Sequence, residues 1–118
     1  MNYCRITEMM LVSVIICTHK MERFNDFIEA VESLISQTYG NIEIITVVDG
    51  NKELYNRIIK EIDIDKIILN KNNLGLSESR NKGIKVAGGD VIAFFDDDAI
   101  ADKNWIKELV RIYEEKGL

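Results

Sequence analysis

The sequence predicts an α/β domain with a parallel sheet and Rossmann-like βα repeats, arranged in three α/β/α layers. Three observations lead to this prediction. Short, nearly continuous apolar runs recur along the chain, as expected of strands that are buried on both faces. Segments with apolar residues at helical spacing follow these runs in turn. The connections are short and rich in Gly, Asn and Asp, so parallel strands with right-handed crossovers are the simplest arrangement.

Four segments have the pattern of strands. They are residues 11–17 (LVSVIIC), 42–48 (IEIITVV), 66–69 and 90–95. The second strand is followed by Asp49-Gly50-Asn51, which is typical turn chemistry, and Gly88-Gly89 forms the turn that leads into the fourth strand. Parallel strands of this kind place their carboxyl ends along one edge of the sheet.

Four segments between or after these strands have apolar residues at helical spacing, which predicts amphipathic helices. The apolar residues are Phe24, Phe27, Ile28, Val31, Leu34 and Ile35 in the first helix, Leu54, Ile58, Ile59 and Ile62 in the second, Leu76, Ile84 and Val86 in the third, and Trp105, Leu109, Val110, Ile112 and Tyr113 in the last.

Composition limits the classes of function. The chain has 118 residues and a net charge of -5, with no cluster of basic residues, which argues against a nucleic-acid partner. Cys4 and Cys17 have neither metal-ligand nor disulfide spacing, so we expect a reducing, cytoplasmic location, and contact with a membrane face is a further expectation. No apolar run reaches the ~20 residues of a membrane span. We expect an N-terminal extension over residues 1–10 and one domain over residues 11–118.

The stretch with the most chemical information is Asp96-Asp97-Asp98, which directly follows the fourth apolar strand. Adjacent carboxylates repel one another, and burying one without a partner is costly. A divalent cation removes that cost, since Mg²⁺ and similar ions bind carboxylates together with substrate phosphates. An acidic turn that caps the following helix is the alternative explanation. Thr18 and Asp49 follow two other strands, so polar groups from three strand ends converge on one edge.

These residues resemble a known family. The chain is similar to the N-terminal, nucleotide-binding half of inverting family 2 glycosyltransferases, which have the A-type, nucleotide-diphospho-sugar transferase fold. The resemblance is carried by VSVIICTHKMERF, SLISQTYGNIEIITVVDGN and NNLGLSESRNKGIKVAGGDVIAFFDDD, and by the segment that begins at Trp105. The segment VVDGNKELYNRI looks most like the corresponding segment of archaeal enzymes that assemble lipid-linked glycans.

The resemblance implies a role for each matching residue. Asp96 and Asp98 would be the DxD pair, with Asp96 near the ribose and Asp98 binding Mg²⁺ or Mn²⁺, and Asp97 lies between them in the donor site. Asp49 would accept a hydrogen bond from N3–H of a uracil-type base, and Thr18 would border the base. Arg80 would contact the nucleotide. The implied partners are a UDP-type nucleotide sugar and a glycan or lipid-linked acceptor.

The sequence departs from the family pattern in two ways. The family often has Asp-Asp-Gly-Ser after the second strand, where this chain has Asp49-Gly50-Asn51. The general base of the family lies in its acceptor half, so we expect it beyond residue 118, and the fold is then truncated. We expect the chain to be either a fragment with a missing C-terminal half or a shortened product that only binds the nucleotide sugar. A homodimer is a further expectation, because a sheet edge would be uncovered. A receiver-type signalling domain fits poorly, because it needs an acidic pair where Thr18-His19 stands.

Overall fold

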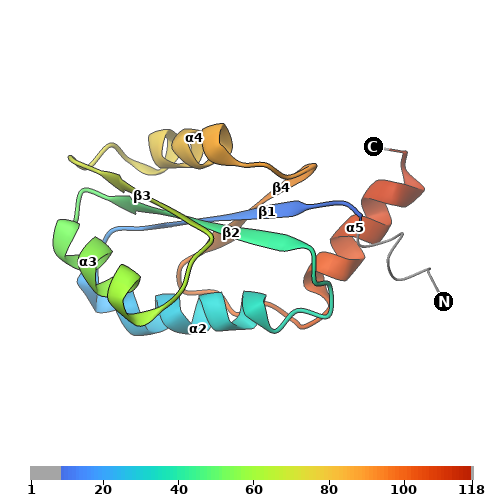
Figure 1. The fold of residues 1–118 in the computed structure, drawn as a ribbon, viewed down its shortest axis with the longest axis horizontal. Helices are drawn as coiled ribbons and strands as arrows, with labels where there is room; N and C mark the ends of the chain where they lie inside the picture. The colour runs from blue at the N-terminus through green and yellow to red at the C-terminus, as the bar shows by residue number, and fades with distance from the viewer. Residues whose placement is uncertain (1–8, 118) are drawn as a thin grey trace.

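The computed structural model describes residues 9–117, and its centre is a four-stranded parallel sheet (Figure 1). The strands are β1 (Val12–Thr18), β2 (Ile42–Asp49), β3 (Lys66–Asn70) and β4 (Val91–Asp96). Their order across the sheet is β3-β2-β1-β4, and every neighbouring pair is parallel. The predicted strands are confirmed to within a residue or two at each end.

The helices cover both faces of the sheet, which confirms the predicted α/β/α arrangement. They are α2 (Phe24–Ile35), α3 (Lys52–Glu61), α4 (Leu76–Val86) and α5 (Trp105–Glu115), and a short 3-10 helix η1 (Met21–Arg23) precedes α2. In Figure 1, α2 and α3 lie on one face and α4 lies on the other. The chain runs outward from β1 to β3 and then crosses back to β4, so right-handed crossovers place α4 on the opposite face from α2 and α3.

The strand order reverses between β1 and β4. The first two crossovers move away from β1 on one side, whereas α4 carries the chain over β2 and β1 to pair β4 with the other side of β1. In open parallel sheets a crevice forms at such a point, beyond the carboxyl ends of the strands. The topology therefore predicts where a ligand would bind.

The main core lies between the sheet and helices α2, α3 and α5. Alternate residues of β1 point into it, and its fully buried members include Val14, Phe27 and Leu34. None of the helices within residues 9–117 is long and apolar enough to span a membrane.

Helix α4 forms where the sequence predicts it, but it does not pack through the apolar residues that suggested it. Leu76 is 55% exposed, and Ile84 and Val86 are also exposed. The buried residues of α4 are Ser79 and Gly83. A Cβ atom at Gly83 would lie 2.7 Å from Cγ2 of Ile15, so α4 approaches β1 closely because its contact face is small.

Strand β4 is an edge of the described sheet, which agrees with the expectation of an uncovered sheet edge. Its core-facing residues Val91 and Ala93 are buried, whereas Ile92 and Phe94 on the other face are 38% and 41% exposed. Strand β3 forms the other edge.

A polar cluster around Glu43 joins the amino-terminal ends of the strands. Its carboxylate accepts hydrogen bonds from Ser13 Oγ at 2.6 Å and from the backbone N–H of Gly88 at 2.7 Å, and it forms an ion pair with Lys66 Nζ at 3.0 Å. These contacts link β1, β2, β3 and the turn before β4. Burial raises the pKa of Glu43, but the three partners together lower it below its ordinary value.

The cluster predicts a pH-dependent contribution to stability. Because the folded pKa of Glu43 is depressed, its stabilising contribution is present at neutral pH and decreases as the pH falls below about 4.5, the ordinary value of the group. We expect Glu43→Gln to lower the free energy of unfolding at neutral pH and to converge with the wild type in acid. Urea unfolding over a pH series measures this, with Glu53→Gln on the exposed side of α3 as the control. A difference that stays constant at all pH values would contradict the assignment.

Candidate functional site

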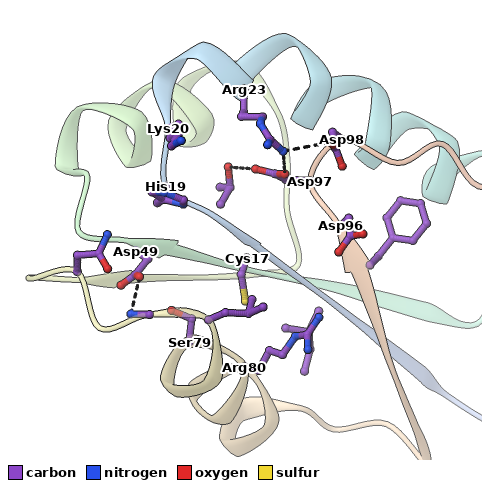
Figure 2. Close-up of a pocket in the computed structure, with 16 residues that line it drawn as sticks. Cys17, His19, Lys20, Arg23, Asp49, Ser79, Arg80, Asp96, Asp97 and Asp98 are labelled. Atoms are coloured by element: carbon purple, nitrogen blue, oxygen red, sulfur yellow. Dashed lines mark hydrogen bonds and ion pairs between the residues drawn. The ribbon is translucent and has the colours of Figure 1, made fainter.

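A pocket lies at the carboxyl ends of β1, β2 and β4, where the strand order reverses (Figure 2). Its volume is about 430 Å³, which is in the range of small-molecule sites. The lining residues come from three strand ends, from the segment after β1 that includes η1, from the loop before α4, and from the first turns of α4. They are Ile15, Cys17, Thr18, His19, Lys20, Arg23, Asp49, Asn73, Gly75, Leu76, Ser79, Arg80, Phe95, Asp96, Asp97 and Asp98.

The three aspartates after β4 have different environments. Asp97 is 9% exposed, and its two oxygens accept hydrogen bonds from Thr18 Oγ1 and Arg23 Nη1, each at 2.8 Å. Asp96 and Asp98 are exposed to the pocket. The buried carboxylate of Asp97 is stabilised because both of its oxygens accept hydrogen bonds and one of the donors is a cation. Asp97 therefore fixes the turn, while the carboxylates on either side of it face the pocket.

The loop that follows the triplet is fastened to α2. Ser33 Oγ accepts from the backbone N–H of Ala101 at 3.0 Å. Gln37 Nε2 donates to the carbonyl of Asp102 at 2.7 Å, and Gln37 Oε1 accepts from the N–H of Ile106 at 3.0 Å, which caps the start of α5. Arg23 at the end of η1 thus holds the triplet, and Ser33 in α2 together with Gln37 just after α2 holds the following loop.

On the other side of the pocket, Asp49 organises the loop between β3 and α4. Oδ1 accepts from Asn70 Nδ2 at 2.9 Å and from the N–H of Leu74 at 2.8 Å, and Oδ2 accepts from the N–H of Gly75 at 2.9 Å. Burial raises the pKa of Asp49, but these donors together lower it below the ordinary value. A carboxylate has about four acceptor positions, so these three bonds leave about one for a ligand.

The turn Asp49-Gly50-Asn51, where the sequence departs from the family pattern, has a defined structure. Gly50 has φ +69°, and a Cβ atom there would lie 2.6 Å from the backbone N of Asn73. Asn51 caps α3 by accepting from the N–H of Leu54 at 3.0 Å, and its Nδ2 donates to the carbonyl of His19 at 3.0 Å. The segment Asp49-Gly50-Asn51 therefore links the carboxyl ends of β1 and β2, and it lies close to the loop before α4.

Arg80 and Cys17 lie between these two sides. The guanidinium of Arg80 stacks over Phe94, 4.6 Å from the ring centroid, which holds its charge beside the pocket. Burial raises the pKa of the Cys17 thiol to about 11. The thiol is protonated at neutral pH, so Cys17 is a poor metal ligand there.

The carboxylates suit a hard divalent cation that also has a phosphate ligand. Within residues 9–117, no group of three or more His, Cys, Asp or Glu side chains is arranged to hold a metal ion alone. Mg²⁺ does not need such a group, because one or two carboxylates and substrate phosphates suffice. Asp96 and Asp98 provide two oxygen donors on the same turn. The donor set therefore fits Mg²⁺ or Mn²⁺ together with a phosphorylated ligand.

All the residues that the sequence analysis selected lie in this one pocket. They are Thr18, Asp49, Arg80, Asp96, Asp97 and Asp98. Their roles toward a ligand stay predictions. The structure adds an internal role to three of them, because Thr18 and Asp97 bond each other and Asp49 holds the loop before α4.

Sequence reasoning missed Arg23 and the pocket residues of the segment 73–79. Arg23 lies 74 positions from Asp97, so no local spacing connects them. The only available signal was its place shortly after the first strand, on the edge where the triplet was expected.

Comparisons with known proteins agree with this architecture. The family model described as Glycosyl transferase family 2 matches residues 13–118. The chain is 48% identical over 108 residues to the glucosyl-dolichyl phosphate glucuronosyltransferase of Haloferax volcanii, covering 89% of this chain and 34% of that protein. It is 32% identical over 110 residues to the glycosyltransferase GlyG of Streptococcus pneumoniae, covering 90% of this chain and 36% of that protein.

Solved structures share the fold. TarS 1-349 of S. aureus superposes with a TM-score of 0.77 at 24% identity, covering 90% of this chain and 33% of that chain, and a crystal structure of the same protein in complex with UDP gives 0.76. The mannosyltransferase PcManGT from Pyrobaculum calidifontis, in complex with GDP-Man and Mn²⁺, gives 0.70 at 19% identity and covers 86% of this chain and 32% of that chain.

The chain spans about a third of the length of these relatives. The resemblance to archaeal glycan-assembly enzymes is confirmed by the Haloferax relative. Since the family model covers the chain from β1 to its last residue, the chain belongs to glycosyl transferase family 2.

Proposed function

We propose that this chain binds a UDP-type nucleotide sugar together with Mg²⁺ or Mn²⁺, as the donor-binding part of a glycosyltransferase. The observation that carries the proposal is the pocket, in which Asp49 stands on one side and Asp96 and Asp98 stand on the other (Figure 2). A nucleotide sugar has a base at one end and a diphosphate at the other. The base would lie on the Asp49 side, and the diphosphate would lie on the side of Asp96 and Asp98.

The charge of the pocket supports a metal-bound diphosphate. Four carboxylates line it, from Asp49 and the triplet, against the three cations Lys20, Arg23 and Arg80, so four minus three leaves one net negative charge when His19 is neutral. A diphosphate would be repelled unless a further cation entered with it. In the proposed site Asp98 and Asp96 would hold that ion, with Asp96 nearer the ribose. When bound, the ion would supply positive charge to stabilise the diphosphate leaving group of sugar transfer.

We place the base beside Asp49 and the loop before α4. The acceptor position that remains on the Asp49 carboxylate would receive N3–H of uracil. Thr18 borders the base from the end of β1, and Arg80 faces the nucleotide from α4. Asp97 supports these contacts from within the turn.

The acceptor proposal rests on the relatives. The Haloferax relative is named for transfer to a glucosyl-dolichyl phosphate, and this chain is 48% identical to it over the aligned residues. We propose a lipid-linked glycan acceptor of the same kind for the complete enzyme. The general base belongs to the part of such enzymes that this chain does not span.

The proposal is tested by nucleotide selectivity. In the presence of Mn²⁺, calorimetry should show UDP binding about tenfold or more tightly than CDP, because N3 of cytosine is an acceptor and would face the Asp49 carboxylate without a proton. ADP is the control for binding that depends on the diphosphate alone. Equal affinity for all three diphosphates would contradict a uracil site.

A further inference from the structure

Arg23 is the cation closest to the aspartate triplet in the described structure. It lies at the end of η1, and its side chain extends into the pocket toward the triplet (Figure 2). A single nitrogen, Nη1, lies 2.8 Å from Asp97 Oδ1 and 3.2 Å from Asp98 Oδ2. One guanidinium thus partly neutralises two neighbouring carboxylates.

The two contacts of Arg23 differ in strength. The Asp97 side chain is 11% exposed and also accepts from Thr18, so its ion pair with Arg23 is largely shielded from water. The Asp98 side chain is 50% exposed, and its contact with Arg23 is longer. Exposed ion pairs contribute little, whereas removing one partner of a buried pair is costly. The contact with Asp98 is therefore the one that breaks easily.

We propose that Arg23 holds the triplet in place before a divalent cation binds, and that it competes with that cation for Asp98. This inference rests on the proposed function, because it assumes a metal ion at Asp98. On metal binding, the Arg23–Asp98 contact is lost while the Arg23–Asp97–Thr18 contacts remain. Arg23 is in this account a positioning residue that lowers metal affinity when no nucleotide is bound.

The competition explains how metal and nucleotide binding become coupled. Without nucleotide, an incoming ion must displace Arg23 from Asp98 and gains only the carboxylates and water as ligands. A diphosphate adds oxygen ligands and negative charge, which favour the ion over the single positive charge of Arg23. The pocket then binds metal weakly alone and more tightly with nucleotide.

The test is Mn²⁺ binding to the nucleotide-free chain, measured from the electron paramagnetic resonance signal of free Mn²⁺. We expect Arg23→Gln to bind Mn²⁺ about threefold to tenfold more tightly than the wild type, because Asp98 loses its competing cation. Arg111→Gln is the matched control. Its side chain is 55% exposed, and it pairs with Glu108 and Glu115 on α5, away from the pocket. Unchanged or weaker Mn²⁺ binding in Arg23→Gln alone would overturn the inference.

A second measurement needs no variant and covers the case in which Arg23→Gln does not fold. In the wild-type chain, nuclear magnetic resonance should show the side-chain Nε–H signal of Arg23 moving when Mg²⁺ is added, while that of Arg111 on α5 stays in place. An unmoved Arg23 signal at saturating Mg²⁺ would contradict the inference. If Mn²⁺ fails to bind the wild type even with UDP, the proposed function itself is wrong. If it binds with UDP but neither Arg23 measurement responds, only the role of Arg23 is wrong.

Discussion

Replacement of Asp98 by alanine is expected to lower UDP affinity in Mn²⁺ by about a hundredfold or more. Loss of a group that only supports a metal ligand lowers metal affinity 10- to 100-fold, so loss of the ligand itself costs at least that much. UDP affinity falls with it, because the metal ion carries the diphosphate. Asp98 is half exposed and faces the pocket, so its removal leaves no buried group without a partner. The fold should therefore survive, and calorimetry should show the defect in UDP binding.

The control is Asp63→Ala, which removes an exposed carboxylate from the loop between α3 and β3, at the opposite edge of the sheet. It changes the net charge by the same amount as Asp98→Ala but leaves the pocket unchanged. UDP affinity that is equal in the two variants would show that Asp98 does not bind a metal ion that carries the nucleotide.

The variant Asp49→Asn should lose stability and the preference for UDP over CDP together. Asp49 is 6% exposed and accepts three hydrogen bonds, and an amide of the same shape has only one oxygen for them. At least one N–H of the loop before α4 then faces another N–H. We expect a loss of roughly 1–3 kcal/mol in the free energy of unfolding. The amide also offers a donor to N3 of cytosine, so the UDP to CDP affinity ratio should fall toward one.

Asp65→Ala separates these two effects. Asp65 Oδ2 accepts from the backbone N–H of Ile44 at 2.7 Å, so the substitution removes a contact between a carboxylate and the backbone away from the pocket. This control should lose stability and keep the UDP to CDP ratio of the wild type. If Asp49→Asn weakens both nucleotides equally, Asp49 is only a structural turn residue.

Much of the fold was predictable because its signals are local. Continuous apolar runs mark β1 and β2, and helical spacing marks α2. The packing of α4 was not predictable in this way. Its sheet-facing residues Ser79 and Gly83 are small, so the spacing of apolar residues did not indicate the contact that positions the helix.

The position of the site was predictable from the carboxyl ends of the strands, which the parallel topology brings to one edge. The internal bonds of the site were not. Asp97 meets Thr18 and Arg23 across more than seventy residues, and Asp49 binds the backbone of a loop whose side chains do not reveal the contact. Only the family resemblance assigned different roles to the three aspartates, and it did not indicate that Asp97 is buried while Asp96 and Asp98 are exposed.

The proposed function depends most directly on a divalent cation that carries UDP into the pocket of the wild-type chain. Calorimetric titrations with UDP should be carried out in Mn²⁺, in Mg²⁺, and in buffer that contains a chelator. We expect measurable UDP affinity in either metal and a loss of about a hundredfold or more in the chelator, at least as large as the loss in Asp98→Ala, because the carboxylates at the pocket then repel the diphosphate. UDP affinity that is the same with and without the metals would contradict a metal-bound diphosphate at Asp96 and Asp98.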